Sequence, residues 1–369
     1  MKKVAVLYSG WSGYWWIYTF FRDIINDIKK ENKDIQIDIF SITDLPPWKL
    51  FDNEYLIKLP NFLKKFLFKF NLHIPFSSLF IPFFFLKKLK TYDKIILNQE
   101  SAFPLWKLLK KSITIIHWTS NWPARYWWNK KKYLYSIYFY LLHLNCILTY
   151  KFSNKIYTVS EYTKNLIKNY NKNIKVCWWW VDLDFWRYND KVSKKDFWFN
   201  NKDFLMIFVW RFDTWKWKED LINIMKNIKD KNVKLICISK KPDNFKDLEK
   251  INIFFFENIN ENRLIDLYSI SDLFVFPTKY EWYGSVIAEA LSIWLPIVTT
   301  NVWLWDILQN KYENKYKKYL NILDTLDDYK KYINIITKIK ENNLEKIKYN
   351  IEEINIQNAL HCWKKVFID

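Results

Sequence analysis

Glycine is nearly absent from this sequence. The chain has 3 Gly among its 369 residues, whereas average usage near 7% would give about 26. Tryptophan shows the opposite bias, with 22 residues, so Gly and Trp together come close to the glycine count that an average protein would have. A Gly-poor helical protein would not need a Trp for each missing Gly, so this composition is not that of an ordinary helical chain.

Cysteine is also scarce, and the pairs that mark metal or redox sites are missing. No C-x-x-C spacing occurs among the four cysteines, which predicts neither a disulfide framework nor a zinc knuckle. The N-terminal residues enter a strand-like run, Val4–Ser9, without the pattern of a signal peptide, so we expect a cytoplasmic protein. The cysteines are Cys146, Cys177, Cys237 and Cys362.

Acidic residues are outnumbered, and arginine is rare. The chain holds 58 Lys and Arg against 39 Asp and Glu, a net charge of +19, yet only five of the cations are Arg. The abundance of Lys, Asn, Ile, Phe and Tyr is typical of an AT-rich gene, so part of the basicity reflects codon usage. The charge still predicts affinity for anionic partners such as nucleotides, phospholipid headgroups or nucleic acid.

Long uninterrupted apolar runs are missing as well. Leu59–Lys90 is rich in Phe and Lys but contains three prolines, and Tyr133–Tyr150 contains Ser, His and Asn. A membrane-spanning helix needs about 20 mostly apolar residues, so neither segment is predicted to span. Two interpretations of the Phe/Lys segment stay open: core residues with a solvated Lys face, or a surface that dips into a membrane interface.

Short β-rich runs alternate with helical segments along the chain, which predicts parallel α/β layers in two Rossmann-like halves. A polar stretch, Asn189–Asp203, is predicted to link them, and Ser160 is a predicted helix N-cap. The expected strands of the first half are Val4–Ser9, Ile35–Phe40, Lys94–Asn98, Ile113–His117 and Lys155–Val159. Those of the second half are Phe204–Val209, Lys234–Ile238, Ile253–Phe256, Leu273–Pro277 and Pro296–Thr300.

The segment from Phe276 to Val298 carries the most chemical information. A strand is predicted to end at Pro277, and a helix to begin near Gly284 and Ser285. The N–H groups at such a helix start can hold phosphate oxygens, helped by the helix dipole. Glu281 precedes the helix and Glu289 lies about one turn inside it. Two carboxylates beside an anion-binding helix start suit a substrate with both phosphate and hydroxyl groups, such as a nucleotide sugar.

This segment resembles the E-x7-E signature of the retaining GT-B glycosyltransferases of family 4, also called group 1. The family pattern reads approximately P-S-x-x-E-G-x-G-x-x-x-x-E-A-x-x-x-G-x-P-V. The sequence departs from it at two family glycines, where Trp282 and Trp294 stand. The matching positions are Pro277, Glu281, Gly284, Glu289, Ala290 and Pro296.

A second segment, Phe208–Lys218, is similar to the family's V-G-R-x-x-x-x-K-G pattern. The departures are again at glycines, where the chain has Trp210 and Trp217. In the family the Arg and Lys hold the donor diphosphate, and the resemblance implies this role for Arg211 and Lys216. Charge-assisted contacts of this type are among the strong ones.

Other family-like positions occur in the first half. Ser12 and Gly13 lie where the family has its Gly-rich first loop, which approaches the donor phosphate and the acceptor. His117 follows a strand where the family often has a His next to the transferred sugar. Asp182 and Asp184 spell D-x-D, but this lies at the family's G-V-D turn, so no metal site is predicted there.

The resemblance implies a GT-B fold, with two Rossmann-like domains facing across a cleft. The predicted acceptor-side domain is 1–188, the nucleotide-sugar domain is 189–350, and a C-terminal helix, 351–369, crosses back to the first domain. The implied activity is that of a hexosyltransferase, which moves a sugar from a nucleotide-diphosphate donor to a glycan or lipid-linked acceptor in cell-envelope polysaccharide or glycolipid synthesis. Retention at the anomeric carbon is implied, with no metal and no cofactor besides the donor co-substrate.

The resemblance also implies a role for each site residue. Arg211 and Lys216 hold the diphosphate, with help from N–H groups at Gly284–Ser285. Glu289 binds the ribose hydroxyls. Glu281 contacts the donor sugar and stabilises positive charge at its reacting carbon, and His117 touches the sugar from the other domain.

The surplus tryptophans have a genetic interpretation. UGA is a stop codon in the standard code and Trp in a common variant, and some bacterial lineages read it as Gly. A gene from such a lineage, translated as if UGA meant Trp, would give this composition. The positions most expected to be glycine are Trp15, Trp180, Trp210, Trp217, Trp282 and Trp294, followed by Trp11, Trp16, Trp118, Trp303 and Trp305. Those with ordinary apolar neighbours, expected to be genuine, are Trp48, Trp106, Trp198 and Trp363.

Other functions remain open at the level of sequence. A non-catalytic basic binder of a membrane surface or of nucleic acid would fit the charge of +19, and a GT-B relative such as a nucleotide-sugar epimerase or a phosphorylase would fit the fold. No nucleic-acid motif occurs, so we expect no nucleic-acid partner. A peripheral contact with anionic membrane, at the inner face of the cytoplasmic membrane, is kept as an alternative to a purely cytoplasmic location.

Overall fold

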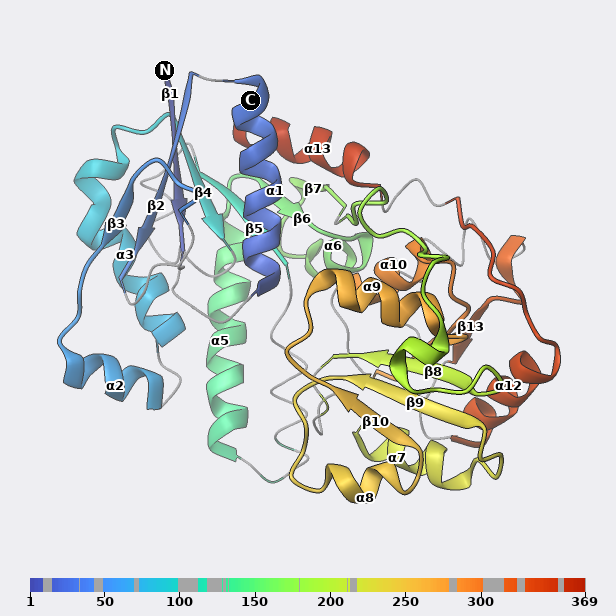
Figure 1. Cartoon of the computed structure of the whole chain (residues 1–369). Helices are drawn as coiled ribbons and strands as arrows, with labels where there is room; N and C mark the ends of the chain where they lie inside the picture. The colour runs from blue at the N-terminus through green and yellow to red at the C-terminus, as the bar shows by residue number, and fades with distance from the viewer. Residues whose placement is uncertain are drawn as a thin grey trace. The chain divides into compact units, whose positions relative to one another are not determined.

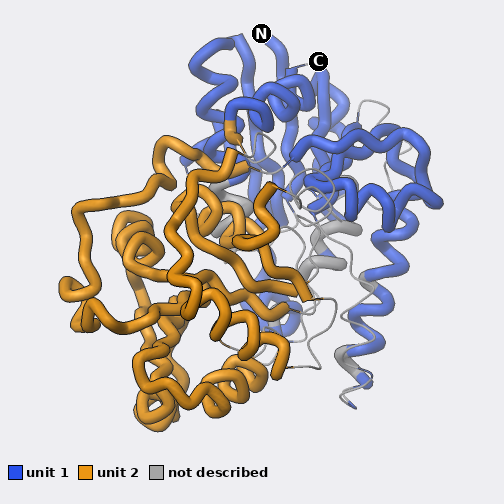
Figure 2. Tube along the Cα trace, turned by 90° about the vertical axis from the view of Figure 1, so that its right-hand side faces the viewer, with its two compact units in different colours: residues 1–178, 357–369 blue, residues 179–356 orange. Residues whose placement is uncertain are grey.

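Two compact units make up the chain, and each is built around its own parallel sheet. The computed structural model describes residues 1–8, 15–32, 34–42, 49–69, 73–98, 112–117, 128, 131, 133–178, 180–210, 212, 218–278, 284–300, 315–323, 329–350 and 355–368. Unit 1 comprises residues 1–178 and 357–369, and unit 2 comprises residues 179–356 (Figure 2). These divisions differ from the predicted boundaries at 188/189 and 350/351.

Unit 1 holds a seven-stranded sheet in the order β3-β2-β1-β4-β5-β6-β7, with all neighbouring strands parallel (Figure 1). Its strands are β1 (Lys2–Leu7), β2 (Ile35–Ser41), β3 (Glu54–Leu56), β4 (Lys94–Asn98), β5 (Ser112–Ile116), β6 (Ile156–Thr158) and β7 (Ile174–Val176). Its described helices are α1 (Trp15–Glu31), α2 (Asn61–Lys69), α3 (His73–Leu89), α5 (Tyr133–Phe152), α6 (Glu161–Ile167) and α13 (Ile356–Ile368).

Unit 2 repeats this plan with a six-stranded parallel sheet in the order β10-β9-β8-β11-β12-β13. Its strands are β8 (Phe204–Val209), β9 (Val233–Ile238), β10 (Ile253–Phe256), β11 (Leu273–Phe276), β12 (Ile297–Thr300) and β13 (Leu320–Leu323). Its described helices are the 3-10 turn η2 (Lys194–Phe197), α7 (Lys218–Asn227), α8 (Phe245–Glu249), α9 (Glu261–Ile270), α10 (Ser285–Ser292) and α12 (Tyr329–Glu341).

The predicted strands are confirmed in both units, because buried parallel strands are short apolar runs that stand out in the sequence. Three strands were not predicted, β3, β7 and β13, which lie at sheet edges and have mixed sequences such as Ile174–Val176. The prediction that Ser160 caps a helix is also confirmed, since its side chain accepts a hydrogen bond from the Thr163 N–H at 3.1 Å at the start of α6.

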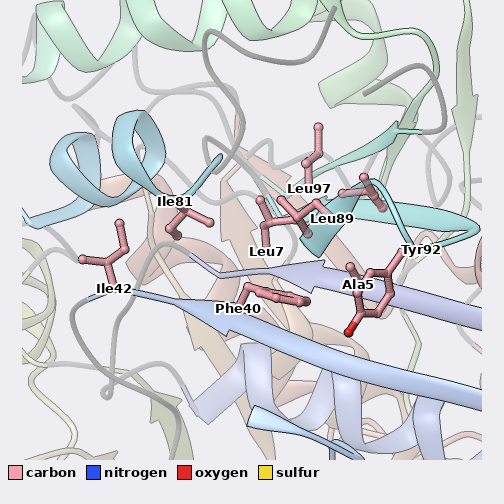
Figure 3. Close-up of a cluster of buried hydrophobic side chains, with 9 residues drawn as sticks. Ala5, Leu7, Phe40, Ile42, Ile81, Leu89, Tyr92 and Leu97 are labelled. Carbon is pink, nitrogen blue, oxygen red and sulfur yellow. The ribbon is translucent and has the colours of Figure 1, made fainter. Parts of the chain in front are cut away.

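Apolar side chains of the sheets form the two cores. In unit 1 a buried cluster joins β1, β2 and β4 to α3, which contributes Ile81 and Leu89 (Figure 3). In unit 2 the rings of Phe208, Phe276 and Phe274 stack across β8 and β11, with neighbouring centroids 5.8 and 5.7 Å apart. These contacts fix the strands whose carboxyl ends carry the candidate site.

The predicted linker, Asn189–Asp203, is wrong as a linker, because this polar stretch packs into unit 2. The Asn189 N–H donates to Ser269 Oγ at 3.0 Å, and Lys194 Nζ lies 2.6 Å from a carboxylate oxygen of Asp272. Phe197, inside the same stretch, is fully buried. Polar composition misled the prediction because the side chains satisfy one another within the unit.

The last helix belongs to unit 1. Trp363 of α13 is fully buried, its ring meets Phe20 edge-on at 4.9 Å between centroids, and its Nε1 donates to the Trp178 carbonyl at 2.9 Å. Lys364 pairs with Asp27 at 2.6 Å on α1. The C-terminal residues thus complete the core of the unit that the N-terminal residues begin.

A disulfide joins Cys177, which follows β7, to Cys362 of α13, with Cα atoms 5.6 Å apart. The scattered spacing of the cysteines, which predicted no disulfide framework, gave no indication of this single pair. The two residues are 185 positions apart in the sequence, so only the packing of α13 on unit 1 brings them together. Cys146 and Cys237 are buried and are not part of this disulfide.

Candidate functional site

The strand order of unit 2 places its candidate site at one edge of the sheet. From the adjacent central strands β8 and β11 the sheet is extended in opposite directions, which makes the carboxyl ends of this pair a topological switch point. Ligands of open α/β sheets bind at such points. In the sequence Arg211 and Lys216 follow β8, and Glu281 follows β11. All three lie outside the described residues.

The carboxyl end of β11 is held firmly against β12. The Thr278 N–H donates to Thr300 Oγ1 at 3.0 Å, and Thr299 Oγ1 donates to the Phe276 carbonyl at 2.8 Å. Thr278 and both partners are buried. These hydroxyls take the place of the backbone groups that would continue the β-ladder beyond the strand ends. They therefore hold the end of β11 in a defined position, from which the chain continues to α10.

Helix α10 begins at Gly284, which has φ 70° and ψ 46°. This left-handed conformation costs glycine little and other residues more. The Gly284 carbonyl accepts from the Ile287 N–H at 2.8 Å, so the first turn is formed directly after it. The N–H groups of Ser285 and Val286, which come before the first of these bonds, point out of the helix start, where an anion is favoured.

Glu289 lies one turn into α10 and is held by Tyr268 of α9. Tyr268 is fully buried, and its Oη lies 3.2 Å from Glu289 Oε2 and 3.3 Å from the Val286 carbonyl. Burial raises the pKa of the Glu289 carboxyl to about 7. The Tyr268 hydrogen bond opposes this shift, and the Glu261 charge adds to it. The site therefore holds an acceptor carboxylate whose charge changes near neutral pH.

At the C-terminus of α10, one residue has a left-handed backbone conformation that its side chain does not favour. The Trp294 N–H donates to the Leu291 carbonyl and the Leu295 N–H to the Ala290 carbonyl, both at 3.1 Å. These two bonds make a Schellman motif, whose left-handed residue is usually Gly. Here it is Trp294, at φ 68°.

In unit 1, His117 follows β5 and lies beside Asn98, the last residue of the adjacent strand β4. Its Nε2 is 2.9 Å from Asn98 Oδ1, and its ring meets the Phe20 edge with 4.9 Å between centroids. Burial lowers the pKa of His117 to about 3. The ring is therefore neutral at physiological pH, and Asn98 fixes its orientation by accepting the Nε2 proton.

The structure brings together some of the predicted site residues. Gly284, Ser285 and Glu289 share one helix of unit 2, while His117 lies at the carboxyl edge of the sheet of unit 1. Those outside the described residues are Ser12, Gly13, Arg211, Lys216 and Glu281. Within the described residues, no group of three or more His, Cys, Asp or Glu side chains could hold a metal ion.

Two residues of the candidate site were not predicted from the sequence. Tyr268 is one of several apolar-facing residues of α9, and no local pattern links it to Glu289. Asn98 gave a weak signal, a polar amide at the end of a buried strand. The D-x-D pair has a structural role, since Asp182 Oδ1 accepts from the Asp184 N–H at 3.0 Å and the Phe185 N–H at 3.1 Å.

Part of unit 2 is similar in sequence to a known protein family. Residues 189–353 match the family model described as glycosyl transferases group 1. The capsular polysaccharide biosynthesis glycosyltransferase CapM of Staphylococcus aureus is 34% identical over 123 residues, 31% of this chain and 32% of that protein. The chain spans about half or less of the length of the curated relatives it matches.

Solved structures match the whole chain. Sucrose-phosphate synthase from Thermosynechococcus elongatus aligns with a TM-score of 0.67 and 14% identity, over 100% of this chain and 95% of that one. Anabaena HepE in complex with UDP aligns with a TM-score of 0.64 and 14% identity, over 100% and 96%. At this identity the likeness concerns the fold, and the predicted GT-B fold is confirmed.

Proposed function

We propose that this protein is a retaining, metal-independent glycosyltransferase of the hexosyltransferase type. It transfers a sugar from a nucleotide-diphosphate donor to a glycan or lipid-linked acceptor in the synthesis of cell-envelope polysaccharide or glycolipid. The observation that carries the proposal is that the family match over residues 189–353 contains the adjacent strands β8 and β11 and the helix α10 that follows β11 in the sequence. A capsular polysaccharide glycosyltransferase among the relatives supports the envelope setting.

The diphosphate of the donor is proposed to bind at the start of α10. Gly284 supplies a left-handed turn without a Cβ, and the N–H groups of the first turn supply donors for phosphate oxygens. Arg211 and Lys216, which follow the neighbouring strand β8, neutralise the charge that develops on the leaving diphosphate. Ser12 and Gly13, which follow β1 in the sequence, are also proposed to bind the donor.

Glu289 is proposed to bind the ribose of the donor. Tyr268 contacts one oxygen of its carboxylate at 3.2 Å, which leaves the other for a pair of ribose hydroxyls. A ribose that donates two hydrogen bonds favours the ionised carboxylate, so donor binding draws Glu289 away from its protonated form. This coupling predicts that donor affinity changes near the pKa of about 7.

Glu281 and His117 are assigned to the sugar. In the proposed front-face reaction, the bond between the anomeric carbon and the diphosphate oxygen breaks while an acceptor oxygen bonds to the same face. The acceptor proton passes to the leaving diphosphate, so no separate base is required. Glu281 stabilises positive charge at the anomeric carbon, and the neutral His117, oriented by Asn98, donates or accepts a hydrogen bond to the sugar.

The glycine-for-tryptophan interpretation is part of this proposal. Trp294 occupies the left-handed position of a Schellman motif, and Trp198 has φ 65° with 84% of its surface exposed. Bulky residues rarely adopt such backbone angles, and an exposed Trp has no core to fill. Trp198 therefore joins the positions proposed to be glycine in the cell, although its apolar neighbours in sequence indicated a genuine Trp. TGG codons at Trp198, Trp282 and Trp294 would contradict this.

The test of the enzymatic role uses a chain with glycine at the six positions most expected to carry it: Trp15, Trp180, Trp210, Trp217, Trp282 and Trp294. This chain is incubated with a panel of nucleotide-diphosphate sugars, and release of the nucleoside diphosphate is measured. We expect turnover with at least one donor, with the anomeric configuration retained by NMR. Glu281→Ala should lower kcat/KM about 10²- to 10³-fold.

The matched control is Glu249→Ala, which removes an exposed carboxylate from α8, outside the candidate site. It should leave turnover unchanged. A chain that binds none of the donors, or in which Glu281→Ala and Glu249→Ala behave alike, would contradict the enzymatic role. The place of action is proposed to be the cytoplasm, at the inner face of the cytoplasmic membrane. Within the described residues, none of the helices is long and apolar enough to cross a bilayer.

A further inference from the structure

Nearly all of the net positive charge belongs to one unit. Unit 1 holds 30 Lys and Arg against 12 Asp and Glu, whereas unit 2 holds 28 against 27. The formal net charges are therefore +18 and +1. Codon usage acts on the whole gene, so it does not account for a difference between two halves of similar size. An anionic partner would be attracted to unit 1.

One strongly basic part of unit 1 includes α2 and α3, which Figure 1 shows on the β3 side of the first sheet. Residues 55–92 contain seven Lys and no Asp or Glu. The same residues contain nine Phe and no Arg. Such a segment combines apolar rings with point charges of a single sign. This is the composition expected of a surface that meets an apolar layer bordered by anionic groups.

One side of these helices is committed to the core. Ile81 and Leu89 of α3 are fully buried in the cluster drawn in Figure 3, and Leu67 of α2 is buried as well. Phe76 and Phe80 are partly buried against the same cluster, with their ring centroids 4.6 Å apart. The fold of unit 1 therefore determines which side of α2 and α3 remains outside.

The outer side carries phenylalanines. Phe62 of α2 is 76% exposed, and Phe83 and Phe84 of α3 are 56% and 55% exposed. Phe83 and Phe84 also lie near the partly buried Phe80, with centroids 6.4 and 6.5 Å away, so the exposed rings extend from a fixed base. Single exposed apolar residues are ordinary, whereas several large rings on adjoining helices mark an interaction surface.

Exposed lysines accompany these rings. Lys65 lies three positions after Phe62, and Lys87 lies three positions after Phe84, spacings that put each pair on one helix face. Lys90 follows at the end of α3 and is also exposed. Lysine can extend its ammonium group to headgroups while its methylene chain stays beside the apolar layer.

We propose that the outer face of α2 and α3, formed by Phe62, Phe83, Phe84, Lys65, Lys87 and Lys90, docks on an anionic lipid bilayer. The rings enter the interface and the lysines bind the phosphate groups of the lipids. The exposed phenylalanines favour a lipid layer as the partner, because a bilayer offers apolar burial for the rings as well as phosphate groups for the lysines. This inference depends on the charge and exposure of unit 1, not on the proposed transfer reaction.

The test is sedimentation of the full chain with vesicles of phosphatidylcholine alone or with 30% phosphatidylglycerol. We expect binding at least about tenfold stronger to the anionic vesicles, weakened by salt. Lys65→Glu with Lys87→Glu should lower binding more than about tenfold, since each lysine near the surface contributes about fivefold. Phe62→Ser with Phe84→Ser should lower binding to anionic vesicles about tenfold.

Matched controls come from unit 2. Lys226→Glu with Lys246→Glu makes the same change of charge at exposed sites of α7 and α8, and Phe185→Ser removes a ring that is 38% exposed. Both should leave binding nearly unchanged. Equal losses in the two units would mean a general charge effect and overturn the proposal. Full binding by the Phe variant, or preference for a DNA oligonucleotide over the vesicles, would do the same. Because no sugar transfer is measured, these outcomes are separate from those that test the enzyme.

Discussion

The two units share one sheet plan but differ in what surrounds it. In each unit the first strand of the sheet lies between the next strand in sequence and a later one, as in Rossmann-like folds. Thus β1 pairs with β2 and β4, β8 pairs with β9 and β11, and all these pairings are parallel. Unit 2 is almost electrically neutral and contains the whole stretch that matches the family model. Unit 1 carries a net charge of +18 and exposes several phenylalanines. The sheet plan is shared, and the difference between the units lies in their surface charge and exposed rings, which fits the two different partners proposed for them.

Tryptophan occupies two kinds of position, one at Trp363 of unit 1 and the other at Trp198 and Trp294 of unit 2. Trp363 fills the core of unit 1, where it contacts Phe20 and Tyr157 and donates a hydrogen bond through Nε1. Trp198 and Trp294 in unit 2 stand at left-handed backbone positions. One residue type therefore occupies a place that requires a large ring and two places that require no side chain. Substitutions can separate the two kinds.

The largest effect on stability is expected at the core position. Trp363→Ala should lower the free energy of unfolding of unit 1 by about 3–5 kcal/mol, because it leaves a cavity among aromatic rings. Trp198→Gly should raise that of unit 2 by about 1 kcal/mol, since it removes the cost of the left-handed backbone. Urea and thermal unfolding measure both, and the second change corresponds to about 2–4 °C in Tm.

The control for the second substitution is Trp198→Ala, which removes the exposed ring but keeps a Cβ at φ 65°. It should give less stabilisation than Trp198→Gly. If the Ala variant is as stable as the Gly variant, the gain comes from loss of the ring, and the left-handed backbone is not the reason. A stabilising Trp363→Ala would remove the distinction between the two kinds of Trp.

The disulfide gives unit 1 a second difference, since unit 2 has only the buried free Cys237. Denatured without reductant, the chain should show two reactive thiols, and four after reduction. Reduction should lower the free energy of unfolding by about 2–4 kcal/mol, because the bond closes a long loop in the unfolded chain. The variant with both Cys177→Ser and Cys362→Ser should not respond to reductant. Four thiols in the unreduced chain would show that the bond does not form.

The sharpest comparison between the two units concerns pH. Glu289 of unit 2 has a pKa raised to about 7, above its ordinary 4.5. The protonated Glu289 therefore contributes to the free energy of unfolding below pH 4.5, and this contribution is lost as the pH rises to 7. His117 of unit 1 has a pKa lowered from 6.5 to about 3, so its contribution is present above 6.5 and is lost as the pH falls. The two units should therefore respond to pH in opposite directions.

Single substitutions show separately how each group changes the stability of the chain with pH. Relative to the unsubstituted chain, Glu289→Gln should lose the decline in stability from pH 4.5 to 7, and His117→Gln should lose the decline from pH 6.5 downward. Each slope is at most about 1.4 kcal/mol per pH unit. Urea unfolding at pH 5, 6 and 7 measures both. For each variant, the slope of stability against pH is compared with that of the unsubstituted chain. If the two slopes change in the same direction, burial does not control the pKa values of Glu289 and His117.

Much of the fold could be predicted from the sequence, for reasons that particular segments illustrate. Phe204–Val209 and Leu273–Phe276 are apolar runs too short for helices, and each becomes a buried parallel strand. The spacing of Glu281, Gly284 and Glu289 indicated a helix start with two carboxylates, and α10 begins after Gly284 as expected. The prediction of a linker was wrong because the composition of Asn189–Asp203 does not show that this stretch bonds to Ser269 and Asp272.

The candidate site was less predictable where its residues meet across the fold. Tyr268 reaches Glu289 from a different helix, and Asn98 reaches His117 from the adjacent strand. Neither pair has a fixed spacing in sequence, because the contact depends on how α9 packs beside α10 and how β4 pairs with β5. Trp198 was also not predictable from its sequence neighbours. These are apolar and indicated a genuine Trp, whereas its backbone is left-handed.

The sequence by itself determined the alternation of strands and helices, the family-like motifs, the excess of Trp over Gly and the basic run 55–92, because each depends on residues close together in the chain. Only the tertiary structure decided which side of α2 and α3 faces outward, which Trp fills a core, and which cysteines pair. It also decided how burial shifts the pKa values of Glu289 and His117 in opposite directions. These properties depend on neighbours that are distant in sequence, and packing alone brings them into contact.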